Sequence, residues 1–161
     1  LYNLLRAMGI EDGIEGLRYA RVVIATDADV DGMHIRNLLL TYFLRYFEDL
    51  VIKGHVYILE TPLFRVRNKK ETRYCFSEAE RDTAAAEIRG HEITRFKGLG
   101  EMMPKVLWET TLNPRTRRLL RVDIADQLVT DRVMNELMGK DASARFRFIM
   151  ERAEEAQELD V

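Results

Sequence analysis

The chain has 161 residues, of which 47% are hydrophobic and 32% are charged, and its formal net charge is −2. This length allows one domain or two small ones with an apolar core, and a charge so close to zero does not by itself indicate nucleic-acid binding. No stretch approaches the roughly 20 consecutive apolar residues of a membrane helix, so we expect no contact with a membrane. The single cysteine, Cys75, excludes an internal disulfide and suits a cytoplasmic protein.

The first twenty residues predict a short helix and a loop. Residues 1–9 have the pattern of an amphipathic helix that stops near Gly9, and residues 10–20 read as a loop. The chain opens on Leu1-Tyr2-Asn3, without an initiator Met or the apolar segment of a signal peptide. We therefore expect it to be a fragment of a longer protein.

A strand, a long helix and a second strand are predicted next. Residues 21–27 are mostly apolar and predict a buried strand, and apolar side chains recur at helical spacing from His34 to about Leu50. Residues 56–59 predict another strand, whose length Pro62 limits. This succession is a βαβ unit, in which the two strands run parallel and the crossover is right-handed.

The sequence changes character after Pro62. Residues 63–66 and 72–76 predict a hairpin, and Ser77 with Glu80 forms a capping-box pattern that opens a helix. Further along the chain we expect a short strand at 92–96, a turn at 97–100, a helix from about 101, a short helix opened by Asn113-Pro114, and two helices at 126–138 and 142–157.

The predicted fold class is α/β. Residues 1–66 form a domain with a parallel βαβ sheet, and residues 67–161 form a mostly helical second lobe. Charge is unevenly distributed over these parts, because basic residues cluster on the predicted hairpin while the last residues of the chain are acidic. We interpret such clusters first as solvated faces.

The most informative motif follows the first predicted strand and reads Thr26-Asp27-Ala28-Asp29-Val30-Asp31-Gly32. In an extended chain, alternate residues point to the same side and lie about 6.5 Å apart. We therefore expect the three carboxylates to gather on one face, where they repel each other unless a cation sits among them. Hard oxygen ligands at this density suit Mg²⁺, Mn²⁺ or Ca²⁺.

Two other metal-dependent motifs begin in a similar way. The spacing of the aspartates matches the first half of an EF-hand loop, but the twelfth loop position is Leu38 instead of Glu, and a strand precedes the loop. A haloacid-dehalogenase phosphatase also starts from Asp-x-Asp after a strand, but Val30 does not offer its threonine-bearing continuation. The end of a parallel strand favours a catalytic Mg²⁺ that faces a phosphate ester.

Further motifs follow the acidic one in order. They are Gly54-His55-Val56-Tyr57-Ile58, Pro62-Leu63, Arg95-Phe96-Lys97-Gly98-Leu99-Gly100-Glu101-Met102 and Leu107-Trp108-Glu109-Thr110-Thr111-Leu112. Together with the acidic motif they resemble the TOPRIM domain and the C-terminal half of the B subunit of a bacterial type IIA topoisomerase, DNA gyrase or topoisomerase IV. The residues do not distinguish between these two enzymes.

The resemblance implies part of an ATP-dependent type II DNA topoisomerase that cleaves and religates double-stranded DNA with Mg²⁺, for which Mn²⁺ or Ca²⁺ can substitute in binding. Asp27 and Asp29 map to the metal ligands, and Asp31 to the third acidic residue of the set. In that family the nucleophile is a tyrosine of the A subunit in an A₂B₂ heterotetramer. None of the six tyrosines here is therefore expected to be catalytic.

The resemblance also implies contacts with DNA. Lys97 and Arg95 map to the family's Lys-Gly-Leu-Gly-Glu region near the cleaved DNA, and His34 and Arg36 follow the acidic motif as further candidates. The family's Glu-Gly-Asp-Ser motif and ATPase lobe would precede Leu1, so we expect no ATP site here and an inactive fragment. An alternative hypothesis is a binding module that only docks the A subunit and DNA.

Overall fold

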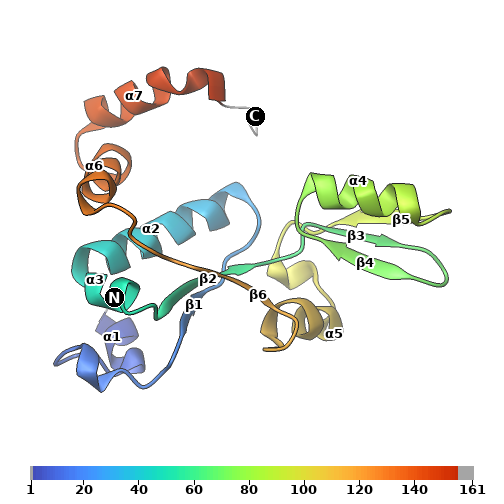
Figure 1. The fold of residues 1–161 in the computed structure, drawn as a ribbon, viewed down its shortest axis with the longest axis horizontal. Coiled ribbons are helices and arrows are strands. Elements are labelled where there is room, and N and C mark those ends of the chain that lie inside the picture. Colours follow the sequence, from blue (N-terminus) through green and yellow to red (C-terminus); the bar gives the residue numbers. More distant parts are fainter. Residues whose placement is uncertain (1, 156–161) are drawn as a thin grey trace. The chain divides into compact units, whose positions relative to one another are not determined.

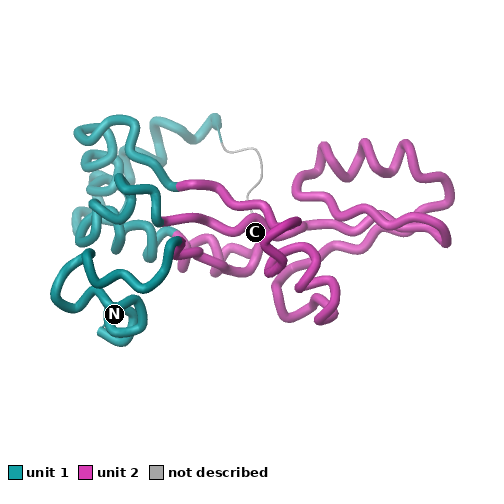
Figure 2. The backbone as a smooth tube through the Cα atoms, turned by 60° about the horizontal axis from the view of Figure 1, so that its bottom comes forward, with its two compact units in different colours: residues 1–20, 37–55, 122–161 teal, residues 21–36, 56–121 magenta. Residues whose placement is uncertain are grey.

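The computed structural model describes residues 2–155 and divides into two compact units, each assembled from separate pieces of the chain (Figure 2). Unit 1 takes residues 1–20, 37–55 and 122–161, and unit 2 takes residues 21–36 and 56–121. The predicted division into residues 1–66 and 67–161 stays a prediction, because units defined by spatial contacts do not test it. No helix among the described residues is both long and apolar enough to cross a bilayer.

Unit 1 consists of helices (Figure 1). It contains α1 (Tyr2–Met8), the 3₁₀ turn η1 (Ile14–Gly16), residues 37–46 of α2 (Val30–Tyr46), α3 (Glu48–Ile52), α6 (Gln127–Met138), α7 (Ala142–Glu151) and the 3₁₀ turn η4 (Ala153–Glu155). The predicted helices near both ends of the chain are confirmed, although α7 ends before residue 157. Residues 156–161, with the last acidic side chains, lie outside the described residues.

Aromatic and aliphatic side chains hold unit 1 together. Tyr42 contacts the rings of Phe43, Tyr46 and Phe47 at centroid distances of 5.6, 5.7 and 5.4 Å. Helix α6 joins α2 through polar contacts as well, because the Arg45 guanidinium donates to Oδ1 of Asn135 at 2.9 Å. The second half of α2 therefore contributes both an aromatic cluster and side-chain contacts with α6.

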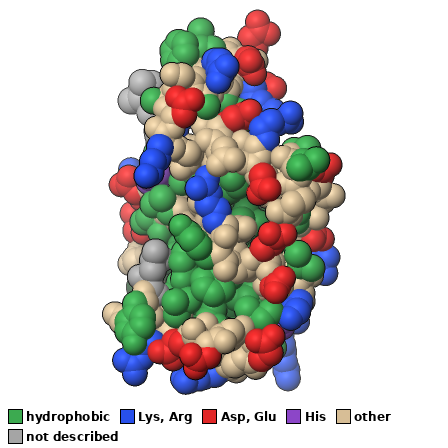
Figure 3. Space-filling model, turned by 90° about the vertical axis from the view of Figure 1, so that its left-hand side faces the viewer, with side chains coloured by type: hydrophobic (Ala, Val, Ile, Leu, Met, Phe, Trp, Pro, Cys, Tyr) green, Lys and Arg blue, Asp and Glu red, His purple; other side chains and the backbone are tan. Residues whose placement is uncertain are grey.

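Some large apolar side chains of unit 1 remain exposed, including Leu128 on α6 and Phe146 and Ile149 on α7. Figure 3 shows apolar side chains gathered on the face that it displays, with acidic and basic side chains around them. Contiguous apolar surface of this kind is uncommon on isolated domains and typically marks a contact surface.

The sheet of the predicted βαβ unit lies in unit 2. Strand β1 (Val22–Ile24) pairs in parallel with β2 (Val56–Glu60), and β6 (Arg118–Arg121) pairs with the other edge of β2 in the antiparallel direction. The strand order is therefore β1-β2-β6. The predicted parallel pair is confirmed, and the antiparallel third strand is an addition that the sequence did not reveal.

One predicted helix is absent, and another is present with different bounds. The helix expected after Asn113-Pro114 is a turn followed by β6, because Oδ1 of Asn113 accepts the Arg115 N–H at 3.0 Å and the chain then pairs with β2. The helix expected from His34 to Leu50 begins at Val30 instead and is interrupted at Phe47, whose ψ of 45° is not helical.

The second sheet of unit 2 carries the predicted hairpin. Strand β3 (Phe64–Arg67) pairs in antiparallel fashion with β4 (Thr72–Cys75) and with β5 (Glu92–Arg95). Helix α4 (Glu78–Glu87) packs on this sheet through a buried cluster. The cluster consists of Phe64, Val66, Cys75, Ala84 and Ile88. The predicted hairpin, helix and short strand are thus confirmed.

The segment after β5 is less regular than predicted. It forms the 3₁₀ turn η2 (Leu99–Glu101), the short helix α5 (Pro104–Leu107) and the π-helical turn η3 (Trp108–Leu112). The Thr110 and Thr111 side chains are buried in η3 and donate to the carbonyl oxygens four residues earlier. Side-chain bonds of this type compete with the regular helical pattern and often bend a helix.

Helix α4 begins with the predicted cap. Oγ of Ser77 accepts the Glu80 N–H at 3.1 Å, and the Glu80 carboxylate accepts the Phe76 N–H at 2.9 Å and a hydrogen bond from Arg118 at 2.8 Å. The bond from Arg118, followed by the backbone bond from Phe76, lowers the pKa of Glu80. This carboxylate therefore links β6 to the start of α4 within unit 2.

The lowered pKa of Glu80 makes stability dependent on pH. Since the folded state favours the carboxylate, its contribution to the free energy of unfolding is present above the unfolded-state pKa and is lost as the pH falls through the folded-state value. We expect Glu80→Gln to reduce the loss of stability between about pH 7 and about pH 3, as measured by urea unfolding. Asp131→Asn, which removes an exposed carboxylate from α6, is the control. An unchanged pH dependence in Glu80→Gln contradicts the assignment.

Candidate functional site

The acidic motif occupies a loop and the first turn of a helix. Strand β1 ends at Ile24 and α2 begins at Val30, so Asp27 and Asp29 lie in the loop while Asp31 is helical. The expected alternation of three aspartates along an extended chain is therefore wrong. The physical reason is a helix cap, since Oδ1 of Asp29 accepts the Gly32 N–H at 2.7 Å and the chain turns before it reaches Asp31.

The three carboxylates do not by themselves form a complete metal-binding site. Among residues 2–155, no three His, Cys, Asp or Glu side chains are grouped closely enough to hold one metal ion. Asp27 and Asp29 are nevertheless exposed, and the hydrogen bond that each accepts engages only Oδ1. Two carboxylates with free oxygens fit a hydrated Mg²⁺, which is usually held by one or two carboxylates together with phosphate oxygens.

A loop far along the chain meets the acidic motif. The Leu99 N–H donates to Oδ1 of Asp27 at 2.7 Å and so joins residues 72 positions apart. A Cβ atom on Gly98 would lie 3.1 Å from the same oxygen, so the backbone approaches the carboxylate as closely as glycine allows. The acidic motif and the Lys-Gly-Leu-Gly motif thus form one site within unit 2.

Gly32 closes the acidic motif for a steric reason. A Cβ atom at this position would lie 2.2 Å from the carbonyl oxygen of Asp27, because the first turn of α2 packs directly on the backbone of the loop. The sequence contained the signal for this approach in the glycine that ends the motif, although its spatial neighbour could not be read from spacing alone.

The four predicted DNA-contact residues differ in their exposure and in their place in unit 2. Lys97 and Arg95 are exposed, Lys97 within the loop that binds Asp27 and Arg95 at the end of β5. His34 is exposed on α2, while Arg36 is half-buried on the same helix. The structure therefore brings Lys97 to the acidic loop through Leu99, and the DNA-contact role of all four side chains stays a prediction.

A cavity of about 360 Å³ opens beside Asp27, at the carboxyl ends of β1 and β2. Its polar lining residues are Thr26, Asp27, Arg36, Glu60 and Thr61. Glu60 and Thr61 were not among the predicted site residues, although both follow a predicted strand at the sheet edge where ligands of α/β proteins bind. Arg36 and Asp27 therefore line the same cavity of unit 2.

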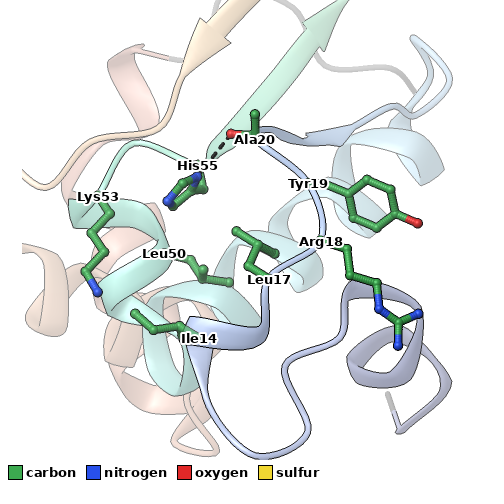
Figure 4. Close-up of a pocket in the computed structure, with 8 residues that line it drawn as sticks. All are labelled: Ile14, Leu17, Arg18, Tyr19, Ala20, Leu50, Lys53 and His55. Carbon is green, nitrogen blue, oxygen red and sulfur yellow. Dashed lines mark hydrogen bonds between the residues drawn. The ribbon is translucent and has the colours of Figure 1, made fainter.

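Unit 1 contains a separate cavity of about 340 Å³, between the segment around η1 and α3 (Figure 4). Its lining residues are Ile14, Leu17, Arg18, Tyr19, Ala20, Leu50, Lys53 and His55. The charged ends of Arg18 and Lys53 lie on opposite sides and do not converge on one point. Nδ1 of His55 lies 3.0 Å from the carbonyl oxygen of Ala20, so this side chain ties together the residues that precede β1 and β2.

Two family models match the chain. The Toprim domain model matches residues 6–61, and the model described as the carboxyl terminus of the DNA gyrase B subunit matches residues 89–150. The first range includes the acidic motif, and the second includes the loop that binds Asp27.

Curated relatives align along almost the whole chain. The B subunit of DNA topoisomerase 4 from Borreliella burgdorferi is 53% identical over 94% of this chain and 25% of the relative. The B subunit of DNA gyrase from Thermus thermophilus is 49% identical over 92% of this chain and 24% of the relative. The B subunit of DNA gyrase from Archaeoglobus fulgidus is 43% identical over 96% of this chain and 24% of the relative. The chain spans about a quarter of the length of the curated relatives it matches.

The close approach of Gly98 to Asp27 predicts a difference between two glycine substitutions. Gly98→Ala puts a methyl group 3.1 Å from the carboxylate, so the loop or the carboxylate must shift slightly, and we expect the Leu99–Asp27 bond to weaken. We expect its free energy of unfolding to fall by about 1 kcal/mol relative to Gly100→Ala. Gly100→Ala is a matched control, because its added Cβ meets no atom within 4 Å. Equal unfolding free energies for the two variants would contradict the expectation.

Proposed function

The chain belongs to the family of DNA gyrase and topoisomerase IV B subunits, and on that premise we propose that it supplies the metal-binding carboxylates of a DNA cleavage centre. The hydrogen bond between Leu99 and Asp27 carries this proposal, because it unites the two motifs in one site. Toprim domains bind divalent metal ions, and here the proposed ion is Mg²⁺. Mn²⁺ or Ca²⁺ would substitute for it in binding.

Asp27 and Asp29 are the proposed ligands of the ion. When bound, Mg²⁺ supplies positive charge that offsets the charge developing on the oxygens of the phosphodiester. Asp31 lies in the first turn of α2, and we assign it the role of third acidic residue, which holds bound water or neighbouring side chains. The exposed carboxylates at the end of β1 support this assignment, since that edge of the sheet is accessible to a DNA backbone.

Basic side chains around the carboxylates are the proposed DNA contacts. Lys97, in the loop that binds Asp27, and Arg95, at the end of β5, are exposed, and each is proposed to bind a backbone phosphate. His34 and Arg36 extend this set along α2. Contacts of this kind position the duplex and do not read its sequence, which suits an enzyme that cleaves DNA for its topology.

The proposed partners are double-stranded DNA and the topoisomerase A subunit, in an A₂B₂ heterotetramer. The A subunit supplies the tyrosine that attacks the phosphodiester, and the complete enzyme changes DNA supercoiling or linkage with ATP hydrolysis outside these residues. The proposed location is the cytoplasm of the bacterial cell, at the nucleoid. The exposed apolar side chains Leu128, Phe146 and Ile149 also favour a docking role for the helices of unit 1.

The metal-dependent role is tested by Asp27→Ala in the complete A₂B₂ enzyme. Loss of a proposed ligand is expected to reduce Mg²⁺-dependent cleavage of duplex DNA by about a hundredfold or more. Asp131→Ala, on the exposed surface of α6, controls for the loss of one carboxylate and is expected to cleave as the wild type does. Wild-type cleavage by Asp27→Ala would leave only the docking role for this chain.

A further inference from the structure

The loop that binds Asp27 is closed by one of its own side chains. Oε2 of Glu101 accepts the Lys97 N–H at 2.8 Å, so the carboxylate spans the loop from its last residue to its first. The backbone adds weaker closures, with the Glu101 N–H 3.2 Å from the carbonyl oxygen of Gly98. The bond that the Glu101 side chain accepts is therefore shorter than the backbone bond that closes the same turn.

The closed loop in turn orients Asp27. Between the two ends that Glu101 joins, the Leu99 N–H points to Oδ1 of Asp27 at 2.7 Å, a short distance typical of bonds to a charged acceptor. The Gly98 backbone lies close to the carboxylate on the same side, because an added Cβ atom would be 3.1 Å from Asp27 Cγ and Oδ1. The position of the loop thus determines which way the remaining oxygen, Oδ2, is directed.

The side chain of Glu101 is exposed, and so is the bond that it makes. Its removal leaves the Lys97 N–H free to bind water, so no buried donor is left unsatisfied and the fold is expected to survive. What is lost is the restraint on the loop, and with it the fixed direction of the Leu99 N–H. A role in stability and a role in orientation are for this reason separable at Glu101.

We propose that Glu101 is a positioning residue for Asp27, which acts through the Lys97 and Leu99 backbone groups to present the carboxylate to a divalent cation. The inference rests on the proposed function, because it takes Asp27 to be a metal ligand. Groups that orient a metal-binding side chain contribute strongly to affinity, and their loss typically weakens binding by tenfold to a hundredfold. Glu101 belongs to this class without touching the ion.

The test is Mn²⁺ binding by the complete A₂B₂ enzyme on duplex DNA, followed by electron paramagnetic resonance. Asp27→Asn defines the background from other sites. We expect Glu101→Ala to raise the dissociation constant of the Asp27-dependent ion by about tenfold with an unchanged melting temperature. Glu101→Gln keeps an oxygen that can accept the Lys97 N–H but removes the charge, and is expected to bind Mn²⁺ within about twofold of the wild type.

Glu109→Ala is the matched control, since it removes an exposed carboxylate from η3 that pairs with Lys105 at 3.9 Å. Wild-type affinity in Glu101→Ala overturns the positioning role, and so does an equal loss in Glu101→Ala and Glu101→Gln, which assigns the effect to charge. If Asp27→Asn retains the full complement of Mn²⁺, the proposed function itself fails. The two failures are thereby distinguished in one series of titrations.

Discussion

The Leu99 N–H lies 2.7 Å from Oδ1 of Asp27, and this contact joins two segments that are 72 positions apart in the chain. It is favoured by the absence of a side chain at Gly98, where a Cβ atom would lie 3.1 Å from the carboxylate. It also demands that the loop before α2 stay in place, which the packing of Gly32 on the Asp27 backbone secures. A glycine of each motif therefore packs closely against the same aspartate, Gly32 against its backbone and Gly98 against its carboxylate.

The sheet explains why this aspartate is exposed at an edge and not buried. Strand β2 is the centre of the first sheet, with β1 parallel on one side and β6 antiparallel on the other. The carboxyl ends of β1 and β2 meet at the cavity beside Asp27. Arg118 of β6 then reaches Glu80 at the start of α4, so the same strand that completes the sheet also joins it to this helix in unit 2.

Local signals predicted most of the regular elements. The cap of Ser77 and Glu80 and the hairpin depend on residues that are close in the sequence, and the βαβ unit follows from the order of its strands and helix; the structure contains all three. The predictions failed where a non-local partner decided the outcome. Residues 118–121 carry no strong strand pattern, and they form β6 because β2 offers a free edge.

The sequence by itself determined the family, the residue types of the site and the order of its motifs, because these depend on chemistry and spacing along the chain. Local structure made Asp29 the cap of α2 and Asp31 helical, and only the tertiary structure decided that Asp27 faces the loop of Leu99. A carboxylate can accept a hydrogen bond from a backbone N–H or from water, or it can coordinate a metal ion, with little difference in local geometry. Its partner is therefore set by which distant segment the fold brings within hydrogen-bonding distance.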